Sequence, residues 1–87
     1  MEGLTEGRIV HFVTEKGAHR PAIIVRVWRV RDMDGNEHPP DNGYSNLVVF
    51  MDGSNDGDQH IGCVNWQTSV EHSAEPRPRT WHWIEKA

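Results

Sequence analysis

Apolar residues along this chain gather in short runs, several of which alternate with polar residues as in β-strands. Residues 7–14 are rich in β-branched and aromatic side chains and end at a turn, so they predict a first strand. Residues 22–30 begin as a nearly continuous apolar run and then alternate, which predicts a second strand that is buried on both faces at its start. No stretch of about ten residues combines helical periodicity with both caps, so we expect little helix.

The second half of the chain predicts three further strands. Residues 45–51 form the third and residues 59–64 the fourth, and the glycine- and aspartate-rich turn over residues 52–58 joins them into a hairpin. Residues 66–71 continue or bend this edge, and residues 80–85 form the last strand.

A long polar segment separates the second and third predicted strands. Residues 32–43 are too polar and too rich in proline for a regular element, so we expect a long loop there. Five short strands with turns between them predict an all-β fold, either a small SH3-like barrel or an OB-like barrel. The 87 residues fit a single domain over 1–87, near the size where one core is only just sufficient, so we also expect a homo-oligomer.

Charge and composition narrow the partners. The net charge of −4 disfavours duplex nucleic acid, whose phosphates such a chain would on balance repel. No apolar run approaches the roughly 20 residues that span a bilayer, and residues 1–7 do not resemble a signal peptide. The single cysteine, Cys63, forms no internal disulfide and fits a reducing compartment. We therefore expect a cytoplasmic protein without a membrane contact.

Motifs for catalysis or metal binding are weak. Residues 52–57 resemble the start of a calcium loop, but Cys63 stands where the bidentate glutamate belongs. His60, His72 and His82 match no known ligand spacing. No nucleophile stands in a strand-turn-helix elbow. We expect no catalytic residues, no metal and no cofactor.

Tryptophan and arginine are concentrated near the C-terminus. On a strand, Trp81 and Trp83 share one face with Arg79, and His82 lies on the other face. Two interpretations remain open: the indoles cap the barrel core, or they stack on a planar ring while arginines hold phosphates. The second interpretation predicts these ligand-binding residues: Trp28, Trp66, Trp81 and Trp83 for stacking, Arg20, Arg26, Arg77 and Arg79 for phosphates, and His11 or His82 for a ribose.

Several segments resemble a group of short proteins encoded in tailed-phage genomes. The resemblance covers residues 7–12, 20–25, 47–50, 69–70 and 80–85, the last of which contain the TWHW motif. Members open with a GRIVHY-type strand and close with a GTWHWPE motif; here Arg79 stands where the family has glycine, and Ile84 where it has proline. Most such proteins have no assigned function.

The phage context implies, by analogy, an anti-defence role. The protein would bind and sequester a small anionic nucleotide-derived immune signal, either cyclic ADP-ribose-like or a cyclic oligonucleotide, in the host cell cytoplasm and without turnover. Two alternatives stay open. One is an SH3-like adaptor that binds a protein or single-stranded nucleic acid, and the other is a hydrolase that degrades the same signal.

Overall fold

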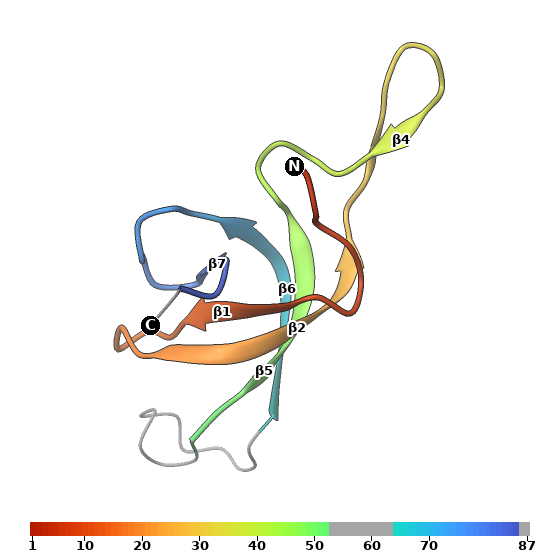
Figure 1. Cartoon of the computed structure of the whole chain (residues 1–87). Helices are drawn as coiled ribbons and strands as arrows, with labels where there is room; N and C mark the ends of the chain where they lie inside the picture. The colour runs from red at the N-terminus through yellow and green to blue at the C-terminus, as the bar shows by residue number, and fades with distance from the viewer. Residues whose placement is uncertain (53–63, 86–87) are drawn as a thin grey trace.

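Five strands close into a barrel in this computed structural model, which describes residues 1–52 and 64–85 (Figure 1). The barrel strands are β1 (Ile9–Val13), β2 (His19–Val27), β5 (Ser45–Phe50), β6 (Val64–His72) and β7 (Thr80–His82). They follow one another round the barrel in chain order, and β7 closes it by pairing antiparallel with β1 and parallel with β6. The predicted small all-β barrel is confirmed. Its sequential strand order is not the Greek key of an OB-fold, which leaves the SH3-like alternative.

The segment expected to be a long loop contains the turn and the second strand of a short hairpin. Strands β3 (Val30–Arg31) and β4 (Glu37–His38) pair antiparallel, and this arm projects away from the barrel (Figure 1). The Asp32 side chain accepts hydrogen bonds from the backbone amides of Asp34 and Asn36, which closes the turn. The expectation of no regular element here was wrong, because local side-chain bonds to the backbone can specify a turn in a polar segment.

Strand β6 includes the edge segment expected after the predicted fourth strand. Residues 66–71, expected to continue or bend the edge, lie within β6, whereas most of the predicted fourth strand and its turn fall outside the described residues. The strand does bend: its register with β5 shifts between Ser45 and Leu47, and Ser69 has a φ of 54°. The Asn46 carboxamide oxygen accepts the Ser69 amide at this bulge. In the described ranges there is no helix, and hence none that could cross a membrane.

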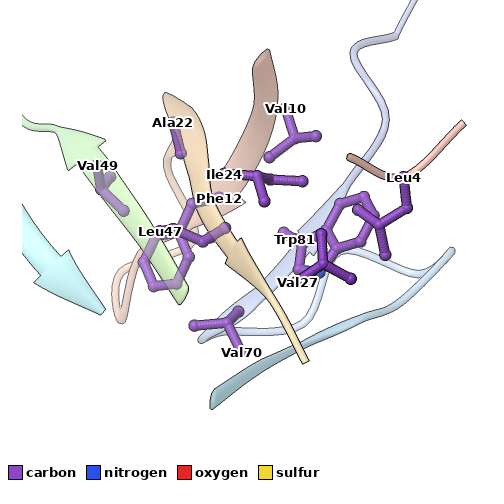
Figure 2. Packing of buried hydrophobic residues seen from close by; sticks show 10 residues of the cluster. All are labelled: Leu4, Val10, Phe12, Ala22, Ile24, Val27, Leu47, Val49, Val70 and Trp81. Carbon is purple, nitrogen blue, oxygen red and sulfur yellow. The ribbon is translucent and has the colours of Figure 1, made fainter. Parts of the chain in front are cut away.

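The core is filled from every strand of the barrel (Figure 2). Alternate residues point inward, so that Val10 and Phe12 of β1 and Ala22 and Ile24 of β2 all enter the core, with Val10 directly opposite Ala22. The complete cluster is Leu4, Val10, Phe12, Ala22, Ile24, Val27, Leu47, Val49, Val70 and Trp81.

Trp81 is the largest side chain in this core and is 0% exposed. Its Nε1 donates to the Gly43 carbonyl oxygen at 2.9 Å, so its polar atom is satisfied. Gly43 has a φ of 70°, and a Cβ added there would lie 2.8 Å from Trp81 Cζ2 and 2.7 Å from the His72 Cβ. The segment before β5 can therefore close over the indole only because residue 43 is glycine.

The N-terminal segment is held against the end of β2 by one carboxylate. Glu6 accepts hydrogen bonds from both terminal nitrogens of Arg29, at 2.7 and 2.6 Å, and from the Val27 amide at 2.9 Å. The Arg29 guanidinium, followed by the Val27 amide, lowers the pKa of Glu6 from 4.5 to about 2.

Replacing Gly43 tests the packing around Trp81. We expect Gly43→Ala to lower the free energy of unfolding by more than about 2 kcal/mol, because it combines a left-handed backbone with an overpacked core. Gly35→Ala is the matched control, since Gly35 also has a positive φ but nothing within 4 Å of its added Cβ. Urea unfolding measures both variants, and equal losses would contradict this account of Gly43.

Acidification tests the Glu6 clamp. Because the pKa of Glu6 is lower in the folded state, its contribution is present above pH 4.5 and is lost as the pH falls toward 2. The side chain is 38% exposed, so we expect Glu6→Gln to cost only about 0.5–1 kcal/mol at pH 7 and almost nothing near pH 2. Unfolding of this variant and of Glu2→Gln, which removes the same charge from an exposed position, is compared at both pH values. A loss independent of pH would refute the clamp.

Candidate functional site

Three histidines gather on the outside of the barrel where β1, β2 and β7 meet. Within β1–β7 pairing, His11 lies directly opposite His82. His19 lies opposite Val13, two residues along β1 from His11, and so belongs to the same face. Because Trp81 points into the core, alternation places its neighbour His82 outside, among the other rings. The ring centroids of His19 and His82 are 4.8 Å apart, and those of His11 and His82 are 5.7 Å apart.

Glu85, three residues beyond His82, completes the group, which we call the His–Glu cluster (His11, His19, His82 and Glu85). Glu85 Oε1 lies 3.3 Å from His11 Nδ1 and 3.3 Å from His19 Nδ1, and it is in close contact with His82 Nε2. One potential ligand atom from each residue lies within 4.8 Å of all the others.

The electrostatics of the cluster centre on that one oxygen. Hydrogen bonding by His82, followed by His11, lowers the pKa of Glu85, so the carboxylate is ionised at neutral pH. A carboxylate oxygen has two lone pairs, and three ring nitrogens converging on it exceed that capacity. A cation at the centre would satisfy all four groups at once.

Side-chain chemistry in the cluster fits a transition-metal ion. Imidazole and carboxylate together suit Zn²⁺ and its neighbours, whereas Ca²⁺ and Mg²⁺ prefer oxygen ligands alone. Tetrahedral ligands about 2.1 Å from zinc are about 3.4 Å from one another. The two 3.3 Å distances from Glu85 Oε1 to His11 and His19 are close to that spacing, and only the more widely separated pairs, which lie within 4.8 Å, would have to approach.

The outer shell of this site is incomplete. Coordination through His82 Nε2 places the ring hydrogen on Nδ1, which is buried and has no acceptor among the described residues. We therefore expect weaker binding than in a zinc site whose every histidine is hydrogen-bonded on its far side.

A cavity of about 210 Å³ adjoins the cluster. It is lined by His19, His82 and Glu85 of the cluster and by Ala74 and Pro76 of the connector between β6 and β7. The connector is held by the Ser73 hydroxyl, which donates to the Glu75 carbonyl, and by the Arg79 amide, which donates to the Val13 carbonyl. Small molecules that enter the cavity would meet the cluster directly.

Of the predicted binding residues, the structure brings His11 and His82 together in the cluster. Trp81 takes the core position that the first interpretation assigned to it, and Trp83 packs edge-on against it with the Arg8 guanidinium over its ring. Ligands cannot stack on Trp81 in this closed barrel.

The other predicted residues lie elsewhere. Arg77 is near Glu71, and Arg79 is near Glu15 with a φ of 66°, a conformation that glycine adopts at no steric cost. Arg20 lies in β2 opposite Phe12. Arg26, Trp28 and Trp66 lie away from the cavity lining, the first two stacked on each other at 4.4 Å and the third exposed on β6.

Sequence analysis missed His19 and Glu85. His11 and His19 are eight positions apart across a turn, and His82 is far along the chain, so no ligand motif joins them. A signal did exist: both histidines flank one hairpin turn, and the register of that hairpin places them on one face. His72 packs on Trp81 instead, where burial, followed by the charge of His82, lowers its pKa. His60, Cys63 and most of the turn resembling a calcium loop lie outside the described residues.

Comparisons of the chain with protein-family models, with curated proteins and with solved structures found no match. The functional argument therefore depends on the geometry of the chain itself.

Proposed function

We propose that the protein binds a divalent transition-metal ion of the Zn²⁺ class at His11, His19 and His82, with Glu85 at the fourth corner. The observation that supports this most is the convergence of three ring nitrogens and one carboxylate oxygen within 4.8 Å. Imidazole nitrogens are the commonest protein ligands for such ions.

The competing explanation is a cluster that only stabilises the barrel. Exposed ion pairs and hydrogen bonds contribute about 0–1 kcal/mol each, and Glu85 is 54% exposed. Such a cluster therefore gives little net stability of its own, so a bound ion is the better reason for assembling it.

Zinc binding can be measured by calorimetry and by the visible absorption of the Co²⁺-substituted protein. We expect one ion per chain. We also expect His82→Ala and His19→Ala each to weaken binding by more than about 100-fold, because even outer-shell changes cost about 10- to 100-fold. Zinc at a hundredfold excess over Kd should raise the free energy of unfolding by about 2.7 kcal/mol.

The matched control for zinc binding is His38→Ala, since His38 is an exposed histidine of the β3–β4 arm. This variant should bind zinc as the unaltered protein does. Binding that survives both cluster substitutions, or that is lost equally in the control, would rule out this site.

Sequestration of a nucleotide-derived signal remains a second proposal, with one observation in its favour. The Arg26 guanidinium lies 4.4 Å from the Trp28 ring centroid, and the Trp28 Nε1 donates to Asn46, which fixes this pair on the outside of the barrel. A stacked guanidinium and indole form a platform for a base and a phosphate. The cavity beside the His–Glu cluster does not support it, since about 210 Å³ is below the roughly 300 Å³ of typical ligand pockets.

Tryptophan fluorescence tests this second proposal with cyclic ADP-ribose and cyclic dinucleotides. We expect saturable quenching that persists in EDTA and is lost in Trp28→Ala, because stacking contributes about 1–3 kcal/mol per base. His82→Ala is the control that should leave it unchanged. Quenching that disappears in His82→Ala instead would place any nucleotide at the metal site.

Several other sequence-based expectations also remain proposals. They are the phage origin, the anti-defence role, the host cytoplasm as location, the homo-oligomer and the adaptor alternative. Among the sequence-based alternatives, the hydrolase gains support from the His–Glu cluster.

A further inference from the structure

The four residues of the His–Glu cluster are not held equally firmly. His11, His19 and His82 belong to three paired strands of the barrel. Glu85 lies beyond the end of β7, and its side chain is 54% exposed, compared with 10% for His82. The carboxylate can therefore leave the centre of the cluster without disturbing the barrel, whereas the histidines cannot.

Glu85 also lies beside open space, which it shares with two of the histidines. His19, His82 and Glu85 all line the cavity, whose remaining wall is the apolar pair Ala74 and Pro76. All three histidines project from the same outer face of the barrel, so they would approach a metal ion from one side and leave its other side open. Structural zinc sites are enclosed by four protein ligands, whereas catalytic sites keep three and leave one position for water.

We propose that the His–Glu cluster is a hydrolytic site for phosphate esters, in which the three histidines hold the metal ion and Glu85 is the general base for a water at the fourth corner. This inference rests on the metal site proposed above. In this inference the histidines are the metal ligands and Glu85 has a different role. If all four residues coordinated the metal permanently, their roles would be the same.

The proposed step balances without an oxidant or a reductant. Water at the open corner gives one proton to the Glu85 carboxylate as its oxygen attacks the phosphorus. The bond from phosphorus to the leaving alcohol oxygen breaks, and that oxygen takes the proton from Glu85. The products are the alcohol and a phosphate with one ester bond fewer, and Glu85 is again a carboxylate.

Cavity size and charge select the substrate class. The cavity of about 210 Å³ is large enough for a phosphoryl group. A divalent ion with one carboxylate leaves a net charge of +1 at the site, which favours an anionic group over a neutral acyl ester. The alcohol portion would lie outside, beyond Ala74 and Pro76.

The open corner is tested first by a spectrum, without turnover. Inorganic phosphate added to the Co²⁺-substituted protein should change the visible absorption, because it replaces water at that corner. Glu85→Gln should retain cobalt with an affinity within about tenfold of the unaltered protein and should still respond to phosphate, since the histidines supply the ligands. If phosphate left the visible absorption unchanged, the fourth metal position would not be open to a ligand. That result would overturn this inference but not the proposed metal site.

Hydrolysis of bis(p-nitrophenyl) phosphate by the zinc-loaded protein tests the activity. We expect Glu85→Gln to lower kcat by about 10²- to 10⁴-fold, the usual contribution of a general base, while zinc remains bound. Glu75→Gln makes the same change in an exposed residue of the connector and should leave kcat unaltered. Preferential cleavage of p-nitrophenyl acetate would refute the phosphate class. Equal rates for Glu85→Gln and Glu75→Gln would refute the general base, and a protein that binds no zinc would instead overturn the proposed function.

Discussion

Burial of the Trp81 indole is the interaction on which the remaining structure depends. The indole fills the centre of a small barrel and donates its one hydrogen bond to Gly43, so it ties the last strand to the segment before β5. Without that contact β7 has little to hold it, since it contributes three residues that pair with β1 on one side and β6 on the other. Burial of Trp81 therefore both closes the barrel and fills its core.

The same burial determines the candidate site. Successive side chains of a strand point to opposite faces, so an inward Trp81 requires an outward His82. Register between β7 and β1 then places His82 opposite His11, and the β1–β2 hairpin adds His19. The cluster thus gets its precision from paired strands, which hold side chains more firmly than loops do. Of the four residues, only Glu85 lies beyond the strands, so it is held less firmly than the histidines.

Two chemically different regions occupy the outside of this barrel. The His–Glu cluster lies at β1, β2 and β7, whereas the stacked pair of Arg26 and Trp28 lies on the other side of β2, beside Asn46 of β5. A site for a metal ion and a platform for a planar ring can therefore coexist without sharing a residue. Substitutions in one region leave the other intact, which makes their contributions separable.

The sequence by itself determined the fold class. Short apolar runs bounded by turn residues, at 7–14 and 45–51, identified strands that the structure contains as β1 and β5, because β-branched and aromatic side chains favour strands. The sequence pattern did not predict the β3–β4 hairpin, because its turn depends on the carboxylate of Asp32 and not on an apolar pattern.

For the site, sequence named His11 and His82 but assigned both to a ribose, and it missed His19 and Glu85. Local patterns say which face a side chain takes relative to its own strand. Which residues of distant strands then meet is decided by register and closure, and these follow from packing Trp81 into the core. Only the tertiary structure, therefore, could turn three scattered histidines into one site.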